Sequence, residues 1–251
     1  MFVGDVGGAM VAVRKSLVVG LAVLIVLLAA LTATVGLGVL GWGVGLACGV
    51  VTAVALTRAG PPALGPADLI TLVRALLTCA LAALVADSFV HDAEVAGLVA
   101  LAVFALMSDA VDGRVARRTG PSSFGARFDG EVDAFLILVL SVYVAAEGRG
   151  WVLAIGLARY AFAAAGWVLP WMRRQLPPRY WRKVVTAAQG IALAVAAADV
   201  VPAWLATAGL LVALALLAES FGRDVLWLWR RRSPERERLA DQSGRTRVPR
   251  P

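Results

Sequence analysis

The stretch that decides the fold is SDAVDGRVARRTGPSSFGARFDGEVD, residues 108–133, which places many charged side chains between two long apolar segments. Asp109 and Asp112 precede the connection between these segments, and Asp129 and Asp133 follow it. Residues three or four apart share one face of a helix, so each pair is expected to point in one direction. The glycines and the proline of the connection would let the two helices return antiparallel. The four carboxylates would then converge.

The chain around this stretch is strongly apolar. Of its 251 residues, 60% are hydrophobic, and the mean hydropathy is +0.81. Several apolar runs reach the roughly 20 residues that a helix needs to cross a bilayer. The first run, residues 16–57, contains no charged residue and is far longer than the apolar part of a cleaved signal peptide. The sequence therefore predicts an all-α integral membrane protein.

Eight membrane spans and a polar tail are predicted. The spans are expected at residues 17–36, 40–57, 67–86, 95–117, 128–146, 151–170, 184–200 and 203–228. We divide the chain into a transmembrane hairpin (1–58), a proline-rich linker (59–66), a six-span core (67–229) and a basic tail (230–251). The tail is polar and poor in apolar residues, so we expect it to be disordered.

The arginines lie in the short segments between alternate spans, whereas the opposite segments carry His91 and several acids. This asymmetry is typical of positive-inside topology, so the arginine-rich side, including the tail and both termini, is predicted to be cytoplasmic. Most of these arginines are interpreted as topology signals that also meet anionic lipid headgroups. Although the net charge is +7, this placement argues against a nucleic-acid partner.

Four carboxylates that converge between membrane-spanning helices would repel one another unless cations neutralise them. The cluster contains no His and no Cys, and ligand sets made only of oxygen favour Mg²⁺ or Mn²⁺ over softer ions. Two such ions a few ångströms apart can bind a transferring phosphoryl group. The sequence thus indicates a two-metal site. A topology loop whose acids pair with nearby arginines is the simpler alternative.

The spacing from Asp109 to Asp133 reads D-x2-D-G-x2-A-R-x7-G-x3-D-x3-D. It resembles the signature of the CDP-alcohol phosphotransferases (CDP-alcohol phosphatidyltransferases), integral membrane enzymes of phospholipid biosynthesis. The family usually has eight residues, not seven, before the second glycine. Residues 66–74, PADLITLVR, resemble the family's P-N-x2-T-x2-R helix, and residues 183–189, KVVTAAQ, resemble its K-x2-T-x2-Q element. The resemblance covers about residues 66–228.

The resemblance implies a role for each matching residue. Asp109, Asp112 and Asp129 would be metal ligands, and Asp133 would be a ligand that also acts as the general base. Substrate-binding roles are implied for Asp68, Thr71, Arg74, Gly113, Arg117, Gly125 and Lys183. Of these, the two glycines would leave room for the cytidine nucleotide, and Arg117 would hold phosphate. Asp68 stands where the family has Asn, and a carboxylate can only accept hydrogen bonds, so it cannot make any bond in which the Asn amide would donate.

Arg159 is a candidate that the family signature does not contain. It lies about 12 Å into its predicted span, and an intramembrane arginine is a functional candidate by default. We interpret it as an acceptor- or phosphate-binding residue, with a structural ion pair as the alternative.

The resemblance also implies the fold and the reaction. The six-span core would be the catalytic domain, and it would transfer a phosphatidyl or related group from a CDP-linked lipid, such as CDP-diacylglycerol, to a small alcohol. CMP would be released at the cytoplasmic face of the cell membrane, and the enzyme would be a homodimer. The acceptor alcohol and the role of the hairpin are left open. A membrane transporter that moves cations along intramembrane carboxylates is the alternative function.

Overall fold

The computed structural model describes the backbone of residues 4–60, 64–119, 123–174, 176 and 179–230, and their side chains except at 4–12, 110, 112–119 and 123. Within these ranges the chain forms eight α-helices, two short 3-10 helices and no strand. The α-helices are α1 (Gly4–Val35), α2 (Val39–Ala59), α3 (Pro66–Asp87), α4 (Val95–Thr119), α5 (Ser123–Ala146), α6 (Leu153–Val168), α7 (Tyr180–Ala198) and α8 (Ala203–Arg230). The tail after residue 230, which we expected to be disordered, lies outside the described residues.

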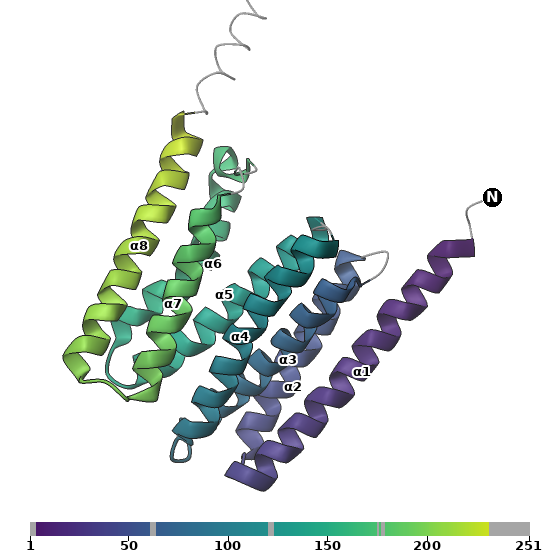
Figure 1. Ribbon diagram of the computed structural model, residues 1–251, viewed down its shortest axis with the longest axis horizontal. Coiled ribbons are helices and arrows are strands. Elements are labelled where there is room, and N and C mark those ends of the chain that lie inside the picture. Colours follow the sequence, from purple (N-terminus) through teal and green to yellow (C-terminus); the bar gives the residue numbers. More distant parts are fainter. Residues whose placement is uncertain (1–3, 61–63, 120–122, 175, 177–178, 231–251) are drawn as a thin grey trace, which may run out of the picture.

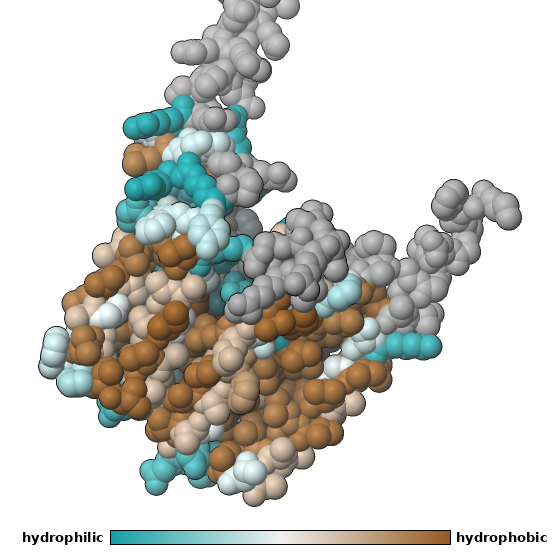
Figure 2. Space-filling view, in the orientation of Figure 1, coloured by the Kyte–Doolittle hydropathy of each residue, from teal (hydrophilic) through white to brown (hydrophobic). Residues whose placement is uncertain are grey.

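Five segments are long and apolar enough to cross a membrane. They are Val13–Val35 of α1, the whole of α2, α3 and α8, and Gly150–Val168, which contains α6. α4 adds a shorter apolar segment, Val95–Asp109. Figure 2 shows hydrophobic residues over the middle of the helices and hydrophilic residues toward their ends. The prediction of an all-α membrane protein is therefore confirmed.

The helices run up and down in one bundle, and α3 lies near its centre (Figure 1). α3 packs against α1, α2, α4 and α5, and α7 packs against α5 and α8. Every residue from Cys79 to Val85 of α3 is buried, and three of the seven are alanines, whose small side chains allow helices to approach closely in a membrane. The beginning of α1, the end of α8, the end of α4 and the beginning of α5 all lie at the same end of the bundle.

Glycines on α2 hold the N-terminal hairpin against the rest of the bundle. Gly41, Gly45 and Gly49 are spaced four apart, so they share one face of α2, and all three are buried. A Cβ atom at Gly41 would lie 2.9 Å from the carbonyl oxygen of Ala83 in α3, and one at Gly49 would lie 2.4 Å from Cδ2 of Leu24 in α1. The close approach of α2 to both neighbours therefore requires glycine at this face.

A polar contact fixes the other end of the hairpin. The backbone N–H of Gly38, between α1 and α2, donates to Oδ1 of Asp87 over 3.1 Å. Asp87 is buried at the end of α3, and Nδ1 of His91 lies 3.3 Å from the same oxygen. The hairpin is thus joined to the second half of α3, the helix whose first half carries Arg74.

Candidate active site

Three of the four predicted acids converge where α4 ends and α5 begins. Three carboxylate oxygens, one each from Asp109, Asp129 and Asp133, lie within 4.8 Å of one another. Asp129 and Asp133 are one turn apart on α5, so the helical period places both on the face toward α3. The convergence that the spacing predicted is therefore present for these three residues.

Three more predicted residues, Asp112, Gly113 and Arg117, belong to α4. Their side chains lie outside the described residues, so their predicted roles stay predictions.

Arg74 of α3 lies at the centre of the acid cluster. Its side chain is 0% exposed, and Nη1 donates to Oδ1 of Asp109 over 2.6 Å. Nη2 donates to Oδ1 of Asp129 and lies 3.3 Å from Oδ1 of Asp133. One guanidinium thus contacts three carboxylates from two other helices. The resemblance implied that Arg74 binds substrate, which stays a prediction; the structure shows that Arg74 contacts three of the predicted metal ligands.

The positive charge of Arg74 partly balances the negative charges of the three acids. A buried arginine without a partner would be strongly unfavourable, and so would three carboxylates at this spacing without a cation. The side chains of Asp109, Asp129 and Asp133 are 45%, 21% and 23% exposed, so the acids line an opening while Arg74 closes its inner end. In the described part of the chain, Nε of Arg74 is buried and has no hydrogen-bond partner.

The cluster fits a small, hard cation. Its ligand atoms are all carboxylate oxygens, which Mg²⁺ and Mn²⁺ prefer. Two ligand oxygens on one Mg²⁺ lie at most about 4.2 Å apart, since each bond is about 2.1 Å long, so a group within 4.8 Å needs only a small adjustment. A cation bound there would use the oxygens that Arg74 now contacts, so the guanidinium and the metal would compete for the same acids.

The other predicted residues of α3 hold the beginning of that helix. Pro66 is its first residue, and Oδ2 of Asp68 accepts a hydrogen bond from the backbone N–H of Gly65 over 2.8 Å. This contact needs only an acceptor, so an aspartate can make it. Thr71 is buried, and its hydroxyl donates to the carbonyl of Ala67 over 3.2 Å. Asp68 therefore caps the helix that carries Arg74, and Thr71 bonds within its first turns.

Arg159 does not join the acid cluster. Its Nη2 donates to Oε1 of Glu131 over 2.6 Å, and both side chains are largely exposed. The alternative interpretation of Arg159, an ion pair, describes this contact. Lys183, at the beginning of α7, is close enough to Asp133 for their charges to interact. Gly125 lies in the first turn of α5, about one turn before Asp129.

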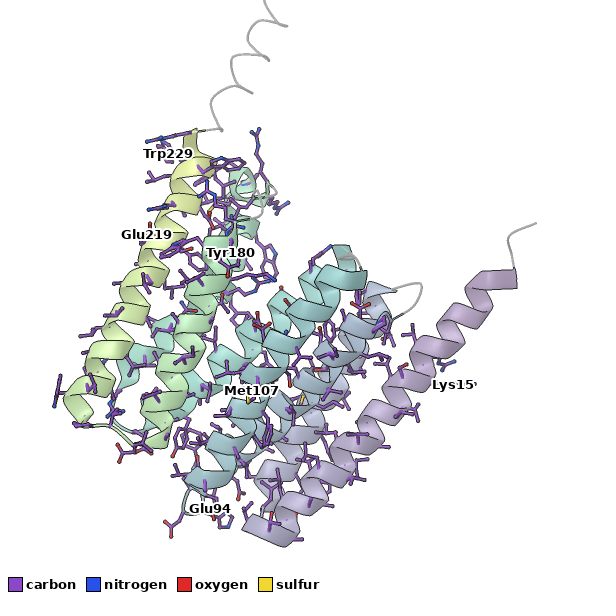
Figure 3. The ribbon with its side chains drawn as sticks, in the orientation of Figure 1. Lys15, Glu94, Met107, Tyr180, Glu219 and Trp229 are labelled. Carbon is purple, nitrogen blue, oxygen red and sulfur yellow. The ribbon has the colours of Figure 1, made fainter. Side chains whose placement is uncertain are left out.

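An ion pair between a half-buried arginine and a buried acid joins α7 to α8, and the sequence interpretation did not include it. Arg182 donates through Nε and Nη2 to the two carboxylate oxygens of Asp224 over 2.8 and 2.9 Å, and Asp224 is buried. Nearby, Nε1 of Trp181 donates to Oε2 of Glu219 over 2.9 Å. Figure 3 shows Glu219 in the half of the bundle away from Glu94, with Trp229 nearer the end of α8. An acid inside the apolar run of α8 was the available signal for this pair.

Comparison with known proteins identifies one family. A family model described as CDP-alcohol phosphatidyltransferase matches residues 65–218. No curated protein and no solved structure matches the chain. The matched range begins one residue before α3, contains the acid cluster and Arg74, and leaves out α1 and α2.

Proposed function

Because the chain belongs to the CDP-alcohol phosphatidyltransferase family, we propose that it transfers a phosphatidyl or related phospho-alcohol group in phospholipid biosynthesis. The donor is a CDP-linked lipid such as CDP-diacylglycerol, the acceptor is the hydroxyl group of a small alcohol, and CMP is released. The observation that supports this reaction best is the convergence of three carboxylates around one fully buried arginine. A pyrophosphate carries the negative charge that such a site, once loaded with cations, can bind.

Asp133 is the proposed general base. The acceptor hydroxyl gives its proton to the Asp133 carboxylate, and its oxygen forms a bond to the lipid-side phosphorus. The bond from that phosphorus to the bridging oxygen breaks, and CMP leaves with the electron pair. Asp133 lies one turn further along α5 than Asp129, and its side chain is 23% exposed, so an acceptor can reach it. A positioned base of this kind contributes a factor of about 10²–10⁴ to the rate.

Mg²⁺ or Mn²⁺ held by Asp109, Asp112, Asp129 and Asp133 would neutralise the pyrophosphate and stabilise the departing CMP. Arg74 keeps these acids together from the buried side of the site. The remaining substrate contacts are proposed for Thr71, Gly113, Arg117, Gly125 and Lys183.

The site is proposed to face the cytoplasm from the cell membrane. The acid cluster lies at the end of the bundle where α4 meets α5, which is also the end where α1 begins and α8 ends. The arginine-rich segments occur at this end, as the positive-inside rule expects for cytoplasmic segments. We also propose that the enzyme is a homodimer.

An assay of the full chain in lipid nanodiscs tests the reaction. Radiolabelled CDP-diacylglycerol and Mg²⁺ are supplied with a panel of acceptor alcohols, and CMP release and lipid product are measured. We expect one acceptor to give both products, and Asp109→Asn and Asp129→Asn to lower metal-dependent donor binding together with the rate. Glu131→Gln is the matched control, because this acid lies on the same helix but pairs with Arg159.

A cation transporter gives a different outcome. Thermal stabilisation by CMP or CDP-diacylglycerol in the presence of Mg²⁺ is expected for the transferase, and a transporter has no reason to bind either compound. Cation flux without nucleotide binding and without CMP release would replace the proposed function.

A further inference from the structure

A second cavity lies between the N-terminal hairpin and the core. It has a volume of about 840 Å³ and an apolar lining that includes Ala47, Val51 and Ala55 of α2 and Phe128 and Phe135 of α5. The α2 residues are spaced four apart, so they form one face of that helix. This wall of the cavity lies outside residues 65–218, the range that the family model matches.

The cavity is separate from the acid cluster. At 100° per residue, the cavity residues of α5 lie on the side of the helix opposite to Asp129 and Asp133. α3 shows the same division, because Ala75 lines the cavity while its neighbour Arg74 contacts the acids. The cavity is therefore a different site from the one that binds the reacting phosphates.

Its position places the cavity inside the bilayer. α2, α3 and the segment that contains α6 are each long and apolar enough to span a membrane, and all three contribute to the lining. The hydrocarbon interior of a bilayer contains no water to fill such a space. Acyl chains are the apolar molecules available at that depth, and the aromatic and aliphatic lining matches their chemistry.

The rim of the cavity carries a positive charge. Arg127, in the second turn of α5, lines the cavity and is exposed, and within the described residues it takes part in no ion pair. The acid of the rim, Glu131, already pairs with Arg159. Arg127 is at the proposed cytoplasmic end of the bundle, where lipid headgroups lie, and a guanidinium there favours an anionic phosphate.

We propose that this cavity binds one anionic phospholipid of the bilayer, with an acyl chain between α2 and α5 and the headgroup phosphate at Arg127. The bound lipid joins the hairpin to the helix that carries Asp129 and Asp133. This role requires neither metal nor nucleotide, so it is independent of the proposed transferase reaction.

Native mass spectrometry of the full chain tests the proposal. The protein is released from nanodiscs that contain equal amounts of phosphatidylglycerol and phosphatidylcholine, and the retained lipids are identified. We expect one retained lipid per chain, with phosphatidylglycerol favoured by about fivefold through one basic residue at the headgroup. Ala55→Trp should abolish retention, because the indole fills the cavity. Val50→Trp is the matched control, since Val50 is exposed on another face of α2.

The charge is tested by a surface substitution that leaves the cavity intact. Arg127→Gln should retain a lipid but lose the preference for phosphatidylglycerol, whereas Arg230→Gln, an exposed arginine at the end of α8, should behave as wild type. Should Ala55→Trp fail to fold, the Arg127→Gln result decides alone. The proposal is overturned if the wild type retains no lipid, if Ala55→Trp retains it, or if Arg127→Gln keeps the preference. A dimer that Ala55→Trp dissociates in lipid-free detergent would instead assign the cavity to a second copy of the chain.

Discussion

Replacing Arg74 with methionine tests whether this arginine holds the acid cluster together when no metal is bound. Methionine keeps much of the apolar length of the side chain but removes the guanidinium that contacts Asp109, Asp129 and Asp133. Without a cation, the three carboxylates then face one another within 4.8 Å. We therefore expect the metal-free variant to be less stable, and Mg²⁺ to restore most of the loss.

The size of the expected loss of stability follows from the burial of Arg74. Removing one partner of a fully buried ion pair costs about 3–5 kcal/mol, and the partial exposure of the three acids favours the lower value, about 3 kcal/mol. At about 2–4 °C per kcal/mol for a chain of this size, the Tm in chelator should fall by roughly 6–12 °C. Mg²⁺ at a hundred times its Kd returns about 2.7 kcal/mol. Because Mg²⁺ no longer competes with a guanidinium, it should also bind the variant more tightly than the wild type.

The assay is thermal unfolding of the purified chain in nanodiscs, in chelator and in Mg²⁺, beside calorimetric titration of the metal. Arg182→Met is the matched control, because it removes an arginine that pairs with the buried Asp224, and the ion pairs of these two residues within the described chain do not include Asp109, Asp129 or Asp133. We expect Arg182→Met to be destabilised equally in chelator and in Mg²⁺. If Mg²⁺ raises the Tm of Arg74→Met no more than that of the wild type, Arg74 and the metal do not share these acids.

Four further predictions follow from the same structure. Chelator should abolish transfer, and Mg²⁺ or Mn²⁺ should restore it; full activity in excess chelator would exclude the metal site. Asp133→Asn should still bind Mg²⁺ and CDP-diacylglycerol, while single-turnover rates fall at least about a hundredfold; near-normal turnover would remove Asp133 as the base. Cysteine introduced at His91 should react with impermeant reagents from outside, and at Leu176 from inside; the reverse pattern would invert the topology. Gly41→Ala should lower stability by about 1–3 kcal/mol in thermal unfolding, whereas Gly43→Ala, with nothing within 4 Å of its Cβ position, should not; equal effects would contradict the packing of α2 on α3.

The sequence carried most of the information about the fold class. A chain segment inside a bilayer must satisfy its own backbone hydrogen bonds, so a long apolar run such as residues 16–57 predicts helices without knowledge of their neighbours. Each predicted span overlaps one α-helix, but only five of the eight contain a described segment that is long and apolar enough to cross a membrane. The largest difference is at α1, which begins at Gly4 instead of residue 17. Arg14 and Lys15 end the apolar run, but charged residues do not end a helix.

The candidate site was predictable only in part. Asp129 and Asp133 share a face because the helical period is a local property. As expected, α4 and α5 bring these two acids close to Asp109. The partner of Glu131 was not predictable, because Arg159 is 28 residues away on another helix. The pair of Arg182 with Asp224, 42 residues apart, was missed for the same reason.

The sequence by itself determined the helical class, the polar end of the bundle and the pairs of acids, because these depend on composition and on spacing along one helix. Only the tertiary structure decided that Arg74 lies between the acids, and that a lipid-sized cavity lies behind them. Arg74 is 35 residues from Asp109 and 55 from Asp129, so its contacts depend on how far α3 is shifted and rotated against α4 and α5. Close packing of small residues, such as Gly41 against Ala83, sets the position of α3 in the bundle, and that packing is a property of several helices together.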